Sequence, residues 1–512
     1  MKTLRFIFFL TLLLAGVQLP IAGQSNKPLR IEFSSFGKSD AYALLRAEEH
    51  GFVVIRDEGK NDDNQNLWSF FGYNVDMKRI WKSKVTLPKD YRLAKKTNYK
   101  THACILFLQQ TNRATDITEV RINMADGSVE KNSLTSDGKI EIQDYKVIED
   151  QSFILALDIK GMKNIFSRLL GSSDAGRRLK FWRSDWSNSS YQELSDSIAD
   201  GMRPKRIDIF LHGETVDVYA VRDVNQQRDD IWLYSFTYQG EYINKYRFSP
   251  VDGRFVVEMA VRSEGRNRYL AATMSGIRDR YDRYEDYSDG IYLGVFRNGE
   301  EAVSRFYKLT NLNAFYAKAD ADMFRFFPGK KEMGGSVGYP LDMHPTIKGK
   351  GNEMIILAEA YYPEYRTEWY YDAYGMAHTR HVFDGYRYTH ALAIAFNSDA
   401  QILWDEGLKI SNIRSYYRKR RVDVISDGTT AGIAYNLDNE IHYQLVVNGD
   451  ADGGTRTVTL PLLSSNDLLK SSNEGSIHYW YDDYLLASGY QKIAHADQGN
   501  RQIFYVYKIG FQ

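Results

Sequence analysis

Three histidines lie close together in the stretch 361–390, which reads YYPEYRTEWYYDAYGMAHTRHVFDGYRYTH. His378 and His381, with His390 nearby, could hold zinc if a third ligand converged on them. The spacing of the first two is i, i+3 in a segment rich in glycine and tyrosine, whereas two zinc ligands on one helix face are usually i, i+4. We therefore predict no metal site and interpret these histidines as loop residues that contact a partner or solvent.

Acidic residues in this stretch and in 277–289 could form a pair of carboxylates of the kind that cleaves glycosidic bonds. The candidates are Glu364, Glu368, Asp372, Asp282, Glu285 and Asp286. An Arg or Lys neighbour could neutralise each of them, and one sequence does not fix the separation of two carboxylates. We therefore assign no catalytic residue and keep a carbohydrate-active enzyme as the alternative.

Residues 334–338 match G-x-S-x-G, the motif in which a strained turn from strand to helix presents a nucleophilic serine. Here FRFFPGKKEM precedes Ser336 and YPLDMHP follows it, so neither a clear strand nor a clear helix flanks the motif. We interpret this segment as a flexible glycine loop.

Asn448, Asp450 and Asp452 are spaced as at the start of a calcium-binding loop. The bidentate acid expected at the twelfth position is replaced by Thr459. Asn, Gly and Asp are also the ordinary residues of a hairpin turn, so calcium is only a weak alternative and no cofactor is predicted.

Aromatic and arginine side chains dominate 361–390, although a simple connection needs only Gly, Asn, Asp, Pro and Ser. Tyr, Trp and Arg are enriched at recognition hot spots, and a tyrosine has only two torsions to freeze on binding. We predict a binding surface that includes similar residues in two other segments. Its members are Tyr365, Arg366, Trp369, Tyr370, Tyr371, Tyr374, His378, Arg380, His381, Tyr386, Arg387, Tyr281, Arg283, Tyr284, Tyr416, Tyr417 and Arg418.

Two other basic segments qualify this prediction. The run 411–421, SNIRSYYRKRR, resembles a nucleic-acid-binding patch. In an exported chain we instead expect it to contact an acidic glycan or the carboxylates of a partner, or to be the solvated start of a strand. The excursion 169–206 contains Trp182 and Trp186 and is either a second interaction element or an ornament that packs on the fold. We expect a helix near 190–202, where Leu194 and Ile198 are four residues apart.

The 512-residue chain carries 66 Lys and Arg against 66 Asp and Glu, so no net field attracts nucleic acid or an anionic membrane. Residues 1–23 have a basic start and an apolar run from Phe6 to Val17, typical of a Sec-type signal peptide. We expect export to the periplasm, the outer membrane surface or the exterior, with no transmembrane segment. The single Cys104 lies in an apolar string and is interpreted as a buried hydrophobe.

A repeat organises the rest of the chain. Each copy has an apolar strand, a tight polar turn and a second alternating strand, and the strong copies follow another short strand. Five copies start at Leu67, Ile231, Ile291, Ala391 and Ile441, and weaker ones start at Thr118 and Arg501. Where no insertion intervenes, the period is about 50 to 60 residues, which is close to that of a four-stranded blade.

This recurrence resembles the β-propeller superfamily in general. It lacks the Trp-Asp ending of WD40 blades and the paired glycines of kelch repeats, so the resemblance implies a shape and no chemistry. We predict an all-β chain in which 24–512 forms one propeller of seven or eight blades, with insertions near 169–206, 277–289, 310–347 and 361–390. Two β-sandwiches are the alternative.

The position of the repeat within a blade predicts where the insertions lie. If each copy is strands three and four, 277–289 and 361–390 connect strands two and three, whereas 310–347 and 411–421 connect consecutive blades. In an up-and-down blade both kinds of connection emerge on one face, and binding residues concentrate on such loops. We expect a non-enzymatic propeller that binds an envelope or extracellular protein there, or a polysaccharide; the inserts could also pack together merely as a cap.

Overall fold

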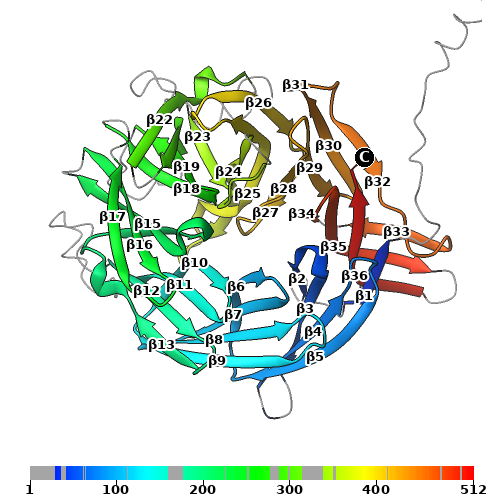
Figure 1. The fold of residues 1–512 in the computed structure, drawn as a ribbon. Coiled ribbons are helices and arrows are strands. Elements are labelled where there is room, and N and C mark those ends of the chain that lie inside the picture. The colour runs from blue at the N-terminus through cyan, green and yellow to red at the C-terminus, as the bar shows by residue number, and fades with distance from the viewer. Residues whose placement is uncertain are drawn as a thin grey trace, which may run out of the picture.

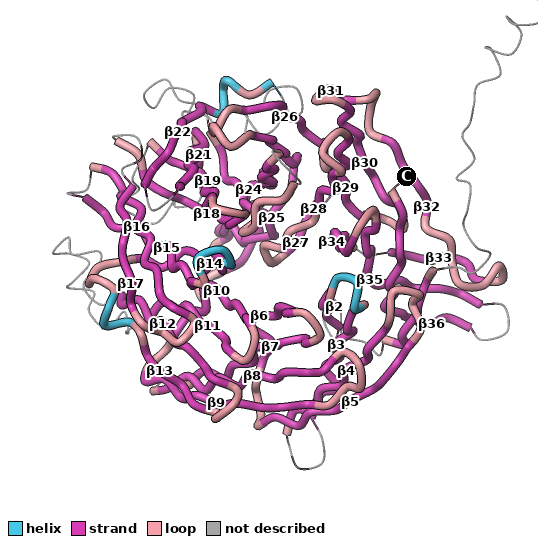
Figure 2. Tube along the Cα trace, in the orientation of Figure 1, coloured by secondary structure: helices cyan, strands magenta, loops and turns pink. Residues whose placement is uncertain are grey.

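The computed structural model describes residues 29–35, 42–60, 63, 65–111, 113–159, 177–224, 227–248, 250, 253–276, 287–297, 300–313, 338–349, 353–411, 413–472, 475–495 and 499–511. These residues form eight antiparallel sheets arranged as the blades of a propeller (Figure 1). The helical elements with bounds inside the described residues are short 3-10 turns (Figure 2): η1 (Glu48–His50), η2 (Ser195–Ser197), η3 (Leu211–Gly213) and η4 (Leu309–Asn311). None of the helices in these residues could span a bilayer.

Each of the first four blades is a four-stranded sheet whose strands follow one another in the chain from the axis outwards. Blade 1 contains β2 (Tyr42–Arg46), β3 (Phe52–Lys60), β4 (Asn66–Tyr73) and β5 (Arg79–Leu87). Blade 2 contains β6 (Arg92–Tyr99), β7 (His102–Gln110), β8 (Ala114–Asn123) and β9 (Val129–Asp137). Blade 3 contains β10 (Ile140–Ile148), β11 (Gln151–Ile159), β12 (Arg177–Asp185) and β13 (Ser190–Glu193). Blade 4 contains β14 (Arg203–Phe210), β15 (Thr215–Val224), β16 (Arg228–Thr237) and β17 (Tyr242–Phe248).

The other four blades carry additions to this plan. Blade 5 contains β18 (Phe255–Glu264), β19 (Asn267–Ser275), β21 (Gly290–Arg297) and β22 (Glu300–Lys308). Blade 6 contains β23 (Tyr339–Met343), β24 (Met354–Tyr371), β25 (Ala377–Phe396) and β26 (Ile402–Lys409), with the short β20 (Tyr287–Ser288) and β27 (Arg414–Ser415). Blade 7 contains β28 (Val422–Ser426), β29 (Thr430–Leu437), β30 (Glu440–Val447), β31 (Asp450–Ala451) and β32 (Arg456–Thr459). Blade 8 contains β34 (Ser476–Tyr481), β35 (Tyr484–His495), β36 (Gly499–Gly510), β1 (Arg30–Ser34) and β33 (Asp467–Ser472).

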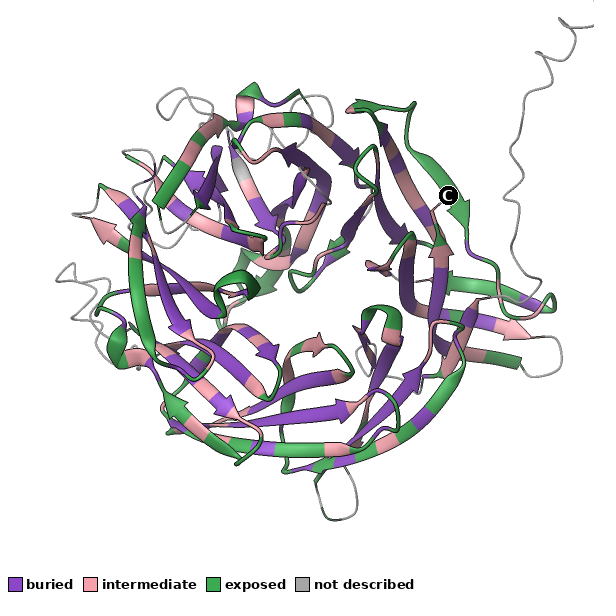
Figure 3. Cartoon of the chain, viewed as in Figure 1, coloured by how far each residue is buried: buried purple, intermediate pink, exposed green. Residues whose placement is uncertain are grey.

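The pattern of burial explains which sequences form which strand. Second strands such as β7, HACILFLQQ, are almost continuously apolar because neighbouring blades cover both faces of the sheet (Figure 3). Outer strands such as β5 alternate buried and exposed residues. Apolar side chains form eight clusters, one between each pair of adjacent blades. The described chain is therefore stabilised by eight small interfaces, and no single large core is needed.

Blade 8 joins the two ends of the chain. β1 near the N-terminus pairs with β36 near the C-terminus, from Arg30 opposite Tyr507 to Ser34 opposite Ile503. The side chain of Arg30 is buried, and it donates to Glu32 Oε1 at 2.8 Å and to Gln491 Oε1 at 2.6 Å. This pairing closes the ring of blades.

The predicted repeat is confirmed strand by strand. The copies at Leu67, Ile231 and Ile291 are the third and fourth strands of blades 1, 4 and 5. Those at Ala391 and Ile441 are the same strands of blades 6 and 7, the copy at Thr118 belongs to blade 2, and the last residues form the third strand of blade 8. The structure has eight sheets within the described residues, which satisfies the prediction of seven or eight blades.

One local prediction in the third blade is wrong. Residues 190–202 do not form the expected α-helix: they begin as strand β13 and continue into the 3-10 turn η2. Leu194 and Ile198 are buried in the cluster between blades 3 and 4, so their spacing reflects packing of an irregular segment. The part of 169–206 that the structure describes supplies the outer strands of blade 3, and Trp182 is buried between blades 2 and 3. Cys104 is buried as predicted, and burial raises the pKa of its thiol to about 12.

Replacing Arg30 by alanine tests the ring closure. The change leaves the nearly buried carboxylate of Glu32 without one of its two cationic neighbours, the other being Arg501 at 3.2 Å. We expect the free energy of unfolding in urea to fall by about 3 kcal/mol, because breaking a buried charge pair strands its partner. The control Arg92→Ala, which removes an exposed hydrogen bond to Gln110, should change it by less than about 0.5 kcal/mol. Equal effects of the two changes would contradict this role for Arg30.

Candidate functional site

The second and third strands of blade 6 extend well beyond their sheet. β24 and β25 pair from Met354–Phe396 to Tyr371–Ala377, whereas β23 pairs with β24 only up to Ala360 and β26 pairs with β25 only from His390. Residues 361–389 therefore form a two-stranded projection, which we call the arm. At about 3.3 Å per residue, the arm is roughly 30 Å long. The sequence correctly placed an insertion here, but it is a continuation of the strands and not a loop.

One face of the arm is charged and internally paired. Alternation along the strands places Arg366 and Glu368 on the same face, with Arg380 opposite Glu368. Arg366 and Arg380 both donate to the Glu368 carboxylate, at 2.7 and 2.9 Å. Towards the base, Arg387 donates to Glu364 at 2.9 Å. We call this surface the charged face.

The other face of the arm is aromatic and carries no Asp, Glu, Lys or Arg. Tyr365, Thr367, Trp369 and Tyr371 on β24 lie opposite Phe383, His381, Thr379 and Ala377 on β25. Trp369 is 73% exposed and Tyr374, in the turn at the tip, is 91% exposed. The exposed apolar residues of the arm are Tyr365, Trp369, Tyr370, Tyr371, Tyr374 and Met376, of which Tyr370 lies on the charged face. We call the surface formed by these four opposed pairs the aromatic face; its members are Tyr365, Thr367, Trp369, Tyr371, Ala377, Thr379, His381 and Phe383.

The base of the aromatic face continues into the fold through ring contacts. Tyr365 packs on Phe383 with ring centroids 5.9 Å apart, and Phe383 packs on Tyr386 at 5.0 Å. Tyr386 in turn contacts Tyr361 at 5.5 Å, and both Tyr361 and its strand partner Tyr388 are buried. These contacts fix the orientation of the arm at its root.

Residues 411–421 clamp this root. Ser415 and Arg414 pair with Tyr386 and Arg387 through β27, and Arg414 also donates to Asp384 at 2.6 Å. Arg418 donates to the hydroxyl of Tyr361 at 2.7 Å. Most of this basic run is therefore engaged inside the molecule, while Tyr416 and Tyr417 remain exposed.

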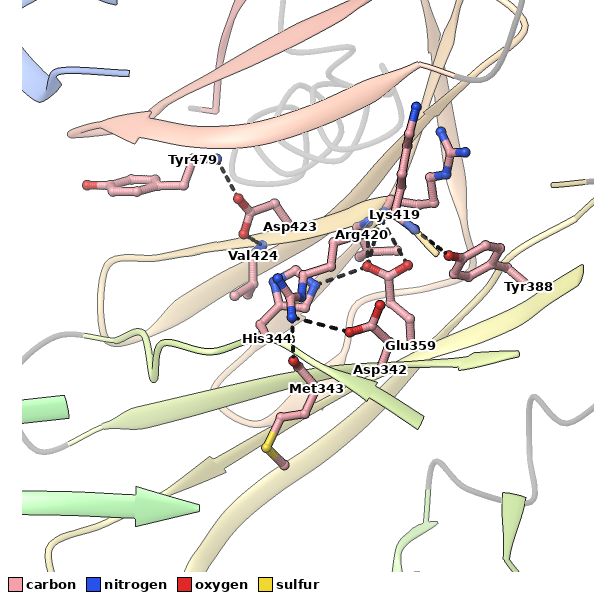
Figure 4. A network of polar contacts seen from close by, with 12 residues as sticks. Asp342, Met343, His344, Glu359, Tyr388, Lys419, Arg420, Asp423, Val424 and Tyr479 are labelled. Carbon is pink, nitrogen blue, oxygen red and sulfur yellow. Dashed lines mark hydrogen bonds and ion pairs between the residues drawn. The ribbon is translucent and has the colours of Figure 1, made fainter. Parts of the chain in front are cut away.

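The buried carboxylate of Glu359 anchors the end of that clamp (Figure 4). Its oxygens accept hydrogen bonds from the backbone N–H groups of Arg421 at 2.8 Å and Val422 at 3.0 Å, and Oε1 lies 3.0 Å from His344 Nε2. In addition, Tyr388 accepts a hydrogen bond from the backbone N–H of Lys419 at 2.9 Å. A single side chain of β24 thus holds the point at which 411–421 enters blade 7.

Burial controls the protonation of this network. It raises the pKa of Glu359 to about 8, with a further increase from Asp342 and an opposing decrease from the N–H donors of Val422 and Arg421. Burial, reinforced by the Arg420 guanidinium, holds the pKa of His344 well below its usual range. Glu258, the neighbour of Asp342 across the blade boundary, has its pKa raised to about 7 by burial and by Asp342. The sequence did not indicate this group, since its members lie on separate strands.

The described parts of 277–289, 310–347, 361–390 and 411–421 all contribute strands to the sheet of blade 6, in agreement with their predicted clustering. β27 from 411–421 pairs with the arm, and β20 at the end of 277–289 pairs with β23 at the end of 310–347. Of the predicted binding residues, the arginines Arg366, Arg380, Arg387 and Arg418 have partners inside the molecule. Tyr281, Arg283 and Tyr284 lie outside the described residues.

The three histidines do not converge. His378 lies 2.8 Å from Asp372 Oδ2 near the tip, His381 lies 3.3 Å from Thr367 on the aromatic face, and His390 is buried in the blade. Burial lowers the pKa of His390 to about 4. Among the described residues, no three His, Cys, Asp or Glu gather as metal ligands.

The other candidate motifs also have structural explanations where the structure describes them. Glu364, Glu368 and Asp372 each face Arg or His, so they do not present two free carboxylates. Asp450 is the first residue of β31, opposite Val447 in the hairpin with β30, and Asp452 pairs with Arg456 at 2.9 Å. Ser336, Asp282, Glu285 and Asp286 lie outside the described residues.

No protein-family model matches the chain, and no curated protein matches it. Among solved structures, it is similar to the polysaccharide lyase Uly1, with a TM-score of 0.39 and 10% identity over 82% of this chain and 90% of that one. It is also similar to the β-propeller domain of the Trilobed protease from Pyrococcus furiosus, with a TM-score of 0.34 and 10% identity over 82% and 95%. A third similarity is to the acylaminoacyl peptidase of Pyrococcus horikoshii, with a TM-score of 0.32 and 13% identity over 80% of this chain and 52% of that one.

These similarities are too weak to carry an argument about function. The propeller architecture itself rests on the eight sheets and their pairing. Any function must be argued from the arm and from the other surfaces of this chain.

Replacing Glu359 by glutamine tests the buried anchor through its pH dependence. With a folded pKa of about 8 and an unfolded value near 4.5, the folded state binds more protons between these pH values, so the contribution of Glu359 to stability falls as pH rises. We expect the unfolding free energy of the wild type minus that of Glu359→Gln, both measured in urea, to fall steadily from pH 5 to pH 8.

Glu368→Gln is the matched control. Hydrogen bonds from Arg380 and Arg366 lower the pKa of Glu368, so its protonation changes below this pH window. A difference that grew with pH for Glu359→Gln, or that matched the control, would overturn the assignment.

Proposed function

We propose that the chain is an exported, non-enzymatic β-propeller that binds an envelope or extracellular protein through the aromatic face of the arm. The observation that carries the proposal is the contrast between the two faces. The charges of the arm are satisfied by one another, while Trp369, Tyr371 and Tyr374 are exposed. Export is supported by the character of residues 1–23.

Several physical properties suit this surface to recognition. Tyrosine and tryptophan offer large contact areas at a low cost in side-chain entropy, and both are enriched among hot-spot residues. The ring contacts at the root and the clamp by 411–421 hold the arm before any partner arrives, which reduces the ordering needed on binding. A face without formal charge also avoids the desolvation of unpaired ions.

The shape of the arm favours a protein over a sugar chain. A two-stranded projection can enter a groove of a partner, and the side-chain alternation of its strands then presents one whole face to that groove. A polysaccharide that stacks on the exposed rings is the second candidate. Catalysis on such a sugar finds no support in the described insert acids, because each of them faces a cation or a histidine.

Replacing Trp369 and Tyr371 together by alanine tests the proposal. The tagged mature protein is used to purify its partner from the native envelope, and the partner is then titrated against each purified variant. We expect at least a tenfold loss of affinity, since two hot-spot side chains each contribute on the order of 2 kcal/mol. The thermal melting of the variant should not change, because both side chains are exposed.

The matched control is Tyr242→Ala with Ile243→Ala, which removes two exposed apolar side chains from β17 on the outer edge of blade 4. It should bind like the wild type. Equal affinity of the arm variant and the wild type would refute the protein-binding proposal. If binding to purified envelope polysaccharides were lost instead, the second candidate would replace the first.

A further inference from the structure

The outer edge of the arm that β24 forms has no partner strand among the described residues. β23 pairs with β24 only as far as Ala360, whereas β24 continues along the arm to Tyr371. The opposite edge, formed by β25, is partly covered because β27 pairs with Tyr386 and Arg387. An edge strand presents a row of backbone N–H and C=O groups, and these groups can pair with a further strand.

The pairing of β24 shows which of its residues direct their backbone groups to this edge. Ile355 exchanges two backbone hydrogen bonds with Lys348, on the side away from β25. At the tip the backbone N–H of Asp372 donates towards β25, to Met376 at 3.0 Å. Both irregularities in the pairing skip a residue of β25 and none of β24, so the alternation of directions holds along the whole of β24. The residues of the arm that direct backbone groups outwards therefore include Tyr365, Thr367, Trp369 and Tyr371.

The distal part of this edge lacks the features that commonly protect an edge strand. Lysine, proline and bulges usually prevent edge strands from pairing with other chains. Pro363 lies near the root, but residues 364–371 contain neither Pro nor Lys, and none of them is skipped in the pairing. Solvent reaches them, since Tyr365 is 58% exposed and Trp369 is 73% exposed. We call residues 364–371 the free edge.

The sequence of the free edge is complementary to itself. When two copies of it are paired antiparallel about a two-fold axis through Thr367, Arg366 of each copy lies opposite Glu368 of the other. The same register places Tyr365 opposite Trp369, and such aromatic pairs stabilise neighbouring strands. An axis through Arg366 or through Glu368 would instead bring like charges together. Charge complementarity thus favours a second copy of this chain as the strand that covers the free edge.

From this arrangement we infer that the free edges of two copies pair antiparallel and join them into a symmetric dimer through their arms. The outward backbone groups of the two copies exchange hydrogen bonds, and Arg366 and Glu368 of the two copies alternate across the junction on the charged face. In this register Tyr371 of one copy reaches Pro363 of the other, short of Ala360, where the pairing with β23 ends. The incoming strand therefore continues the position of β23 in the sheet and does not replace it.

This inference does not rest on the proposed function. The proposed protein partner contacts side chains of the aromatic face, whereas the second copy contacts the backbone edge of β24. Pairing of two arms leaves both aromatic faces on the same side of one joined sheet, where they remain available to the partner. A change at Thr367 that prevents dimerisation leaves Trp369 and Tyr371 in place, so failure of one proposal is distinguishable from failure of the other.

Thr367→Pro in the full-length mature protein tests the pairing. It removes the backbone N–H at the two-fold axis, and this group does not point to β25. Sedimentation velocity over a range of concentrations should show a monomer–dimer equilibrium for the wild type and at least tenfold weaker association for Thr367→Pro. Thr379→Pro is the matched control: Thr379 lies opposite Trp369, so its N–H points outwards from β25, and the variant should dimerise like the wild type. A wild type that stays monomeric, or an equal loss in both variants, would overturn the inference.

Disulfide cross-linking gives a second measurement that does not depend on how the arm tolerates proline. Residue 367 lies opposite its own copy in the inferred dimer, with the two Cα atoms about 5.5 Å apart, which suits a disulfide between the copies of Thr367→Cys. The native Cys104 is buried and does not compete. Mild oxidation should convert Thr367→Cys into a covalent dimer on a non-reducing gel and leave Thr379→Cys monomeric. Cross-linking of neither variant, of both equally, or of Thr379→Cys alone would contradict the inferred pairing.

Discussion

The pairing of β1 with β36 is the interaction on which the rest of the structure depends. Each blade buries its faces against two neighbours, so a ring that remained open would expose an apolar face on blade 1 and another on blade 8. Closure supplies the missing interface: Phe33 of β1 packs on Phe71 and Tyr73 of blade 1, with ring centroids 5.6 and 6.1 Å apart. Closure also brings the innermost strands around a common axis, which places residues distant in sequence opposite one another.

The up-and-down order of strands within each blade then fixes where variation can occur. Connections between strands two and three, and between consecutive blades, leave the ring on the same side. Blade 6 uses both, since its second and third strands extend into the arm and 411–421 returns across the root. Glu359 links the two through backbone hydrogen bonds at Arg421 and Val422. A rigid, repeated scaffold thereby supports an exposed projection whose charges are already neutralised.

The sequence predicted the scaffold better than the sites. The repeated pattern of an apolar strand, a tight turn and an alternating strand correctly predicted the third and fourth strands of the blades, because each unit of the repeat is a local hairpin. Residues 361–390 were predicted as a loop, although their many tyrosines, with Tyr374 and Gly375 between the strands, favour an extended hairpin. The Leu194 and Ile198 spacing misled because tertiary packing, not helical periodicity, buries both side chains.

The central claim is that one face of the arm, and not the other, meets a protein partner. Thr379 and Arg380 are neighbours on β25, but Thr379 lies opposite Trp369 on the aromatic face and Arg380 lies opposite Glu368 on the charged face. A photoreactive phenylalanine derivative placed at each position in turn, followed by irradiation in the native envelope, compares the two faces at almost the same point of the arm. Our account predicts a discrete cross-linked protein from position 379 and little from position 380. Cross-linking from position 380 alone, or equally from both, would contradict it.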